Sequence, residues 1–210
     1  MSVHCCGPAH SHRSTIGPNV RRVLWIALVV NLVMFVVEVA GSVKSGSVSL
    51  LADSVDFAGD AANYGISLAV LSMGLAWRSR AAMVKGLSMA AYGLFVVGNT
   101  VWMGLVGSTP EPMMMGSIAA LALFANVAVA MMLYAFRDGD ANMRSVWLCS
   151  RNDAVGNLAV MLAAAGVSGT GSGWPDLVVA LTMGGLALSS GVAVVRQARQ
   201  ELGVTQPLVA

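Results

Sequence analysis

Four aspartates lie within apolar stretches of the sequence, where ionised side chains are unusual. Asp53, Asp56 and Asp60 occur in the run LLADSVDFAGDAAN, and Asp153 occurs in the run WLCSRNDAVGN. An ionised carboxylate at the centre of a bilayer costs roughly 2.5–3.5 kcal/mol on insertion scales, so four unpaired carboxylates would cost on the order of 10 kcal/mol. A positively charged ligand would offset this cost. The sequence therefore predicts a site for metal ions.

Both stretches have the three- and four-residue spacing that places side chains on one face of a helix. The first polar stripe comprises Ser49, Asp53, Asp56, Asp60, Asn63 and Ser67, and the second comprises Ser145, Cys149, Asp153 and Asn157. On antiparallel helices, Asp56 and Asp60 can lie opposite Asp153 and Cys149, respectively. Three carboxylates and a thiolate at four corners suit a tetrahedral ion of the zinc type. These four residues are the predicted metal ligands.

Other residues near these ligands have more than one interpretation. Asp53 could support the site, hydrogen-bond neighbouring backbone or pair with Arg151. A single cysteine in a membrane helix, such as Cys149, is often only a small apolar residue. Glu38, in the preceding apolar stretch, could line the ion path and tune the site, or it could make an ordinary hydrogen bond between helices. We expect Asp53, Asn63, Asn157 and Glu38 to be supporting residues.

The composition predicts an all-α integral membrane protein. Hydrophobic residues make up 57% of the 210 residues and charged residues only 10%, far from the composition of a soluble domain. Six apolar runs approach or exceed the ~20 residues that a spanning helix needs. They cover residues 23–43, 48–75, 82–106, 113–136, 145–168 and 175–195. No proline interrupts them beyond the first turn of the last run, so we expect six unbroken transmembrane helices.

Basic residues predict the orientation of these helices. With both termini in the cytoplasm, only Lys44 falls in an outer loop, as the positive-inside rule requires. The inner segments then hold Arg13, Arg21, Arg22, Arg78, Arg80, Lys85, Arg137, Arg144, Arg196 and Arg199. These residues form no continuous stripe that could follow nucleic-acid phosphates, so we expect no nucleic-acid partner. We expect a cytoplasmic tail over residues 1–20, a membrane domain over 21–200 and a short cytoplasmic tail over 201–210, in a bacterial inner membrane.

Two segments resemble the cation diffusion facilitator family of divalent metal transporters. The passage FVVEVAGSVKSGSVSLLADSVDFAGDA resembles the family's first-to-second span passage, and CSRNDAVGN resembles its fifth span. In that family, the second span supplies His-x-x-x-Asp or Asp-x-x-x-Asp and the fifth usually supplies His-x-x-x-Asp, and together they bind the transported cation. The resemblance places Asp56, Asp60 and Asp153 on three of these positions. It also implies a homodimer.

The sequence departs from the family's pattern at two points. Cys149 stands where the family usually has histidine or aspartate, which favours zinc or cadmium over manganese or magnesium. Cobalt and iron remain alternatives. The chain also ends soon after the sixth apolar run, whereas most family members continue into a cytoplasmic metal-binding domain that strengthens their dimer. We therefore expect a short form of the family.

The amino-terminal segment MSVHCCGPAHSH contains all three histidines and two of the three cysteines. His4, Cys5, Cys6, His10 and His12 offer the nitrogen and sulfur ligands that zinc prefers. We expect this tail to capture metal near the inward-facing site, with its cysteines reduced in the cytoplasm. A purification remnant and an inert tail of chance composition are the alternatives.

These patterns predict a transporter with no enzymatic activity and no resident cofactor. We expect efflux of a divalent cation by alternating access in exchange for protons, because metal ligands must be deprotonated to bind. A membrane metalloenzyme that holds a catalytic ion and a phosphorylated lipid precursor is an alternative. The flanking Asp-Gly and Ala-Arg pairs typical of alcohol phosphotransferases are absent around Asp53 to Asp60. A passive cation channel and a metal sensor are further alternatives.

Overall fold

The computed structural model describes residues 18–69, 75–135 and 141–204, and these residues form six long helices. The helices are α1 (Pro18–Ser45), α2 (Val48–Ala69), α3 (Leu75–Val106), α4 (Pro112–Tyr134), α5 (Ala141–Thr170) and α6 (Trp174–Val204). Each corresponds to one of the six predicted apolar runs. Several extend beyond their run into polar sequence, and α3 begins seven residues earlier than predicted because the segment LAWRSRA continues the helix. The predicted all-α fold is confirmed.

Local sequence accounts for the helix ends. Glu111 caps α4, because its side chain accepts hydrogen bonds from the backbone N–H groups of Met113 and Met114 at 3.0 and 2.7 Å. Pro112 follows at the first helical position, where a missing N–H costs nothing. The tight turn between α1 and α2 uses Gly46 with a φ of 72°, a conformation that glycine adopts without strain. Pro112 therefore starts a helix and does not break one.

Four of the described helices are long and apolar enough to cross a membrane. These four are α1, α3, α4 and α6. The helices that carry the aspartates, α2 and α5, do not belong to this set. Their polar side chains are instead placed among other helices, as the packing of α2 shows.

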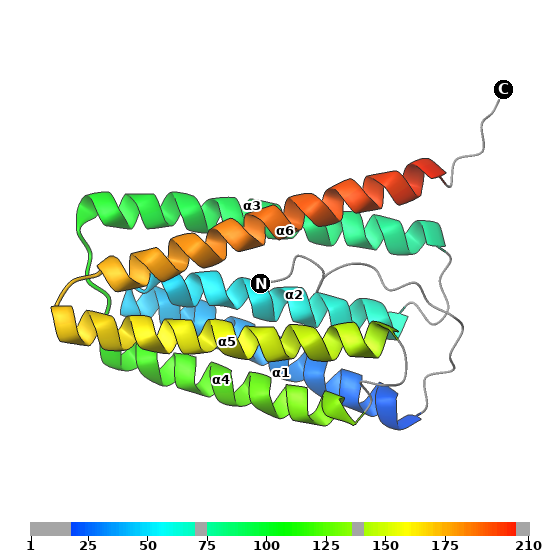
Figure 1. The fold of residues 1–210 in the computed structure, drawn as a ribbon, viewed down its shortest axis with the longest axis horizontal. Helices are drawn as coiled ribbons and strands as arrows, with labels where there is room; N and C mark the ends of the chain where they lie inside the picture. Colours follow the sequence, from blue (N-terminus) through cyan, green and yellow to red (C-terminus); the bar gives the residue numbers. More distant parts are fainter. Residues whose placement is uncertain (1–17, 70–74, 136–140, 205–210) are drawn as a thin grey trace.

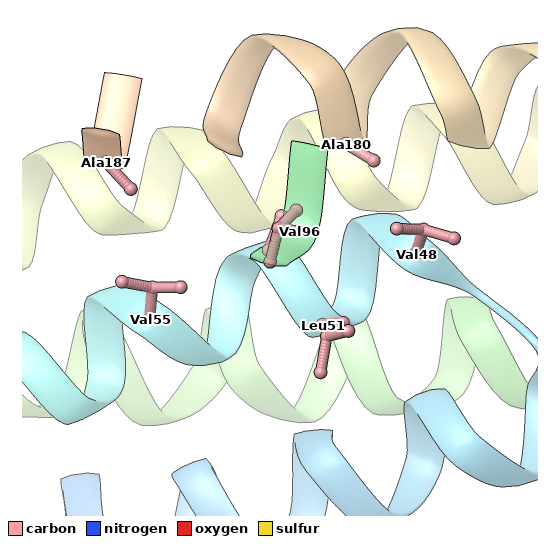
Figure 2. Close-up of a cluster of buried hydrophobic side chains, with 7 residues drawn as sticks. Val48, Leu51, Val55, Val96, Ala180 and Ala187 are labelled. Carbon is pink, nitrogen blue, oxygen red and sulfur yellow. The ribbon is translucent and has the colours of Figure 1, made fainter. Parts of the chain in front are cut away.

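Helix α2 runs through the middle of the bundle. Figure 1 shows α3 and α6 as one pair and α4 and α5 as another, with α2 lying between them, and α2 contacts α1, α3, α5 and α6. One face of α2 packs through Val48, Leu51 and Val55 against α3 and α6, as Figure 2 shows. Another packs through Leu50 against Met115 of α4 and apolar residues of α5. These two apolar contacts fix the rotation of α2, so its polar stripe is directed into the bundle.

Helices α3 and α6 approach each other closely at small residues. A Cβ atom on Gly93 would lie 2.7 Å from the backbone nitrogen of Leu188, and one on Gly191 would lie 2.6 Å from that of Ala90. Both distances are shorter than real Cβ contacts allow. Glycine at these positions lets the two backbones meet, the usual device for close helix packing in membranes.

Asp176, in the first turn of α6, ties one end of the bundle together. Its carboxylate accepts hydrogen bonds from the hydroxyl groups of Ser47 and Ser49, both at 2.6 Å, and from the backbone N–H groups of Val48 and Ser49, at 2.8 and 3.1 Å. The negative charge lies at the positive end of the α2 helix dipole. A buried side chain of α6 thus caps α2 and fixes the level at which α2 begins.

Candidate functional site

Asp60 lies at the contact between α2 and α5. The Tyr64 hydroxyl, one turn along α2, donates to Asp60 Oδ2 at 2.9 Å and is 2.8 Å from the hydroxyl of Ser150 on α5. The Ser150 hydroxyl also lies 3.4 Å from Asp60 Oδ2. The carboxyl groups of Asp60 and Asp153 interact across the same contact. The structure therefore brings one predicted ligand from each helix together, beside two neutral hydroxyl groups.

Asp53 lies in a second polar network further along the same contact. The side-chain amide of Asn157 on α5 donates to Asp53 Oδ2 at 2.5 Å, and Asn126 Nδ2 on α4 donates to Asn157 Oδ1 at 3.0 Å. A carboxylate only accepts hydrogen bonds, so Asn157 must turn its amide nitrogen to Asp53 and its oxygen to Asn126. The network thereby orients Asp53 through a chain of two asparagines, and it places Asn157, a predicted supporting residue, beside Asp53.

Glu38 of α1 faces Asp53 from the other side. The two carboxyl groups are close enough to interact, and Asp56 lies within electrostatic range of Glu38. Both Glu38 oxygens and Asp53 Oδ1 are buried, and none has a hydrogen-bond donor among the described residues. The group that faces Glu38 between the helices is thus another carboxyl, that of Asp53, with which it can share a hydrogen bond when one of the two carries a proton. It adds a further carboxyl group to the polar interior of the bundle.

Asp56 is partly buried on the α5 side of α2. Its Oδ2 lies 3.9 Å from the position that a Cβ atom on Gly156 would occupy, and Asp53 Oδ1 lies 3.5 Å from the same point. The end of the Met183 side chain lies 3.3 Å from the same point, so Gly156 adds no side chain of its own where Met183 and the two carboxylates meet. Asp56 and Asp153 also take part in interactions with other residues.

The three predicted aspartate ligands do not form a ready-made metal cluster. Within the ranges that the structure describes, no group of three or more His, Cys, Asp and Glu side chains is gathered closely enough to hold an ion. Cys149 belongs to α5, but its side chain lies outside the described part, as does that of Arg151. The predicted capture residues His4, Cys5, Cys6, His10 and His12 also lie outside the described residues.

Lys85 of α3 is buried among the helices of the bundle. Its expected place is a cytoplasmic segment, where a lysine would face water. Lys85 is only 8% exposed, and its Nζ donates a hydrogen bond to Asn63 Oδ1 on α2. The ammonium group also attracts the carboxylate of Asp60. Asn63, a predicted supporting residue, thus holds a positive charge beside a predicted ligand.

Sequence reasoning did not single out several side chains that contact the aspartates. Tyr64 follows Asp60 by four residues and Ser150 precedes Asp153 by three, so helical spacing could have identified both. Asn126 and Lys85 reach the polar interior from α4 and α3. Their roles depend on the rotation of those helices, for which the sequence carries no local signal.

Comparison with known protein families agrees with this arrangement. A family model described as the cation efflux transmembrane domain matches residues 24–202, which is most of the chain and includes both aspartate-bearing helices. The chain belongs to the cation efflux family. As a cation efflux protein, it is a membrane protein and a divalent cation transporter of the cation diffusion facilitator kind. Members of this family are transporters and not enzymes.

Proposed function

We propose that this cation efflux protein exports zinc or cadmium from the cytoplasm in exchange for protons. Cobalt and iron are secondary candidates for the cargo. The observation that carries the proposal is the contact of Asp60 on α2 with Asp153 on α5 inside the helix bundle. Asp56, one turn from Asp60, supplies the third carboxylate, and Cys149 is the proposed fourth ligand. Its thiolate would favour the softer metals.

We expect a divalent cation to gather Asp56 with Asp60 and Asp153, whose carboxyl groups already interact. Like charges repel strongly in surroundings of low dielectric constant, so carboxylates spread apart when no cation lies between them. A divalent ion would reverse this balance and draw Asp56 toward Asp60 and Asp153.

Proton exchange follows from the chemistry of the ligands. Carboxylates and a thiolate bind metal only when deprotonated, so protons compete with the ion for the same atoms. We propose that the site opens to the cytoplasm to take up metal and then to the outside, where protons displace it. In this mechanism all six helices span the membrane, α2 is enclosed by its neighbours, and both termini lie in the cytoplasm.

Further parts of the proposal concern the tail, the assembly and the location. The histidines and cysteines at positions 4–12 would concentrate metal near the inward-facing site. We propose that residues 21–200 form the membrane domain, that the protein acts as a homodimer, and that it lies in a bacterial inner membrane. Protons and divalent cations are its proposed soluble partners.

Transport into vesicles tests the proposal directly. The purified protein is reconstituted, a proton gradient is imposed, and zinc, cadmium, cobalt, iron and manganese are followed with internal indicators. Loss of groups that merely orient a metal ligand costs about 10–100-fold in affinity or activity, so Asp60→Ala and Asp153→Ala should each reduce zinc transport at least that much. A chain lacking residues 2–12 should be slower only at limiting metal.

Glu111→Gln is the matched control, since it removes a carboxylate charge at an exposed position outside the bundle interior. It should transport like the parent. Normal transport by both aspartate variants would show that the proposed site is wrong. Metal movement that never runs uphill with the proton gradient would indicate a passive channel.

A further inference from the structure

A lysine on α3 is directed at the candidate metal site. Lys85 is almost fully buried, and its Nζ donates to Asn63 Oδ1, one turn beyond Asp60 on α2. Among the described residues, Lys85 supplies the positive charge that acts on Asp60. Tyr64 and Ser150, the other groups that contact this carboxylate, are neutral hydroxyls.

A buried ammonium group needs a specific partner. Taking a charge out of water is costly unless an opposite charge and hydrogen bonds compensate for it. Lysines near helix ends in membranes normally extend their head groups to the aqueous surface. Lys85 instead turns toward α2, where Asn63 accepts its hydrogen bond and Asp60 supplies the opposite charge. The position of its head group is thus explained by the hydrogen bond to Asn63 together with the electrostatic attraction of Asp60.

We propose that Lys85 is a tethered counter-ion that competes with the transported divalent cation for Asp60. This inference rests on the proposed function. In the metal-free protein, the ammonium group offsets part of the negative charge of the aspartates. When the ion binds, repulsion between the two cations pushes the Lys85 ammonium group away from Asp60, and its hydrogen bond to Asn63 keeps it from returning while the ion is bound. When the ion leaves, Lys85 returns and promotes release.

The chemistry of lysine suits this role. The ammonium group is a compact point charge on a flexible four-carbon stem, so it can withdraw without movement of the helix backbone. It cannot donate electrons to a metal ion while protonated, and so it excludes the ion and does not bind it. A competitor attached to the protein lowers metal affinity equally at every metal concentration. Lys85 would therefore set the affinity of the site.

Metal binding to the purified full-length protein in detergent tests the proposal. Dissociation constants for zinc are measured by competition with a fluorescent chelator. Lys85→Met retains the length of the side chain but removes its charge, and it should bind zinc about tenfold more tightly because the competing charge is gone. Lys85→Arg keeps the charge and should remain close to the parent. Lys44→Met is the matched control, because Lys44 is exposed at the end of α1.

Asn63→Ala provides a second variant with the opposite expected sign. Without the Asn63 acceptor that holds it in this structure, the Lys85 head group should move onto Asp60 and weaken zinc binding. Unchanged or weaker binding by Lys85→Met would overturn the proposal. If Lys85→Met does not fold, Asn63→Ala decides: weaker binding supports the competition, and unchanged or tighter binding overturns it.

Asp60→Asn separates this inference from the proposed function. If it leaves zinc affinity unaltered, the site between α2 and α5 is wrong and the proposed function fails with it. If it abolishes binding while Lys85→Met binds like the parent, the metal site stands and only the role of Lys85 fails. General damage to the fold would not shift affinity in opposite directions in the Lys85 and Asn63 variants.

Discussion

Glu38 is a buried carboxyl group that faces a second carboxyl group without a donor between them. Neither of its oxygens, nor Asp53 Oδ1, has a hydrogen-bond partner among the described residues. Glu38→Gln replaces the carboxyl group with an amide of similar shape, whose N–H group can donate to Asp53. We therefore expect the metal-free variant to be more stable than the parent by ~1–3 kcal/mol, the usual cost of an unsatisfied buried group. Thermal unfolding in detergent measures the change.

Glu111→Gln is the control for the same chemical substitution at an exposed helix cap. It should lower stability slightly or leave it unaltered, because the amide retains only one acceptor for the α4 N-terminus. A Glu38→Gln variant less stable than the parent would contradict the prediction. That result would mean that the Glu38 and Asp53 pair already holds a bridging proton or cation.

Residue types and spacing predict one part of the candidate site. The period of the helix identifies Asp53, Asp56, Asp60 and Asn63 as one polar face of α2, and the structure places this face inside the bundle. The side chains of other helices that contact these residues could not be predicted in this way. Asn126 and Lys85 look like isolated polar residues in sequence, and their contacts depend on how α4 and α3 rotate against α2. That rotation follows from packing over whole helices.

At the scale of helices, the contact between α3 and α6 depends on glycines. Gly93→Ala would place a methyl group 2.7 Å from the Leu188 backbone nitrogen, where no flexible side chain can move away. The two helices must then separate, and we expect a loss of ~1–3 kcal/mol in the free energy of unfolding, as is usual for overpacking. Denaturation followed by circular dichroism measures this loss.

Gly98→Ala, on the same helix, is the matched control. No atom lies within 4 Å of the position that its methyl group would occupy. This variant should gain up to about 1 kcal/mol from the better helix propensity of alanine. Equal effects of the two substitutions would show that close approach of the backbones at Gly93 does not hold α3 against α6.

The helices themselves could be predicted more completely than their contacts. Six apolar runs and the positions of the prolines suffice for six helices, because length and hydrophobicity are local properties of the sequence. The cap that Asp176 provides for α2 could not be predicted in this way. The two segments are far apart in the chain, and an aspartate after Pro175 looks like a residue of its own first helical turn.

At the scale of the whole molecule, the number of spans determines which side of the membrane each loop faces. Helices α2 and α5 are not among the four described helices that are long and apolar enough to cross a membrane, yet α2 is enclosed by its neighbours and needs little contact with lipid. A polar helix can cross a bilayer when its polar face is buried in protein. The enclosed position of α2 therefore favours six spans over four.

The loop between α3 and α4 distinguishes these two arrangements. With cytoplasmic termini, six spans place Thr109 outside, whereas four spans without α2 and α5 place it inside. Thr109 and Ser172 are both exposed, and Ser172, between α5 and α6, faces outward in either case. In a chain whose three native cysteines are replaced by serine, Thr109→Cys should react with a membrane-impermeant maleimide on intact cells as fully as Ser172→Cys. Labelling of Thr109→Cys only after permeabilisation, with Ser172→Cys reactive throughout, would contradict six spans, because α2 would then not carry its aspartates across the membrane.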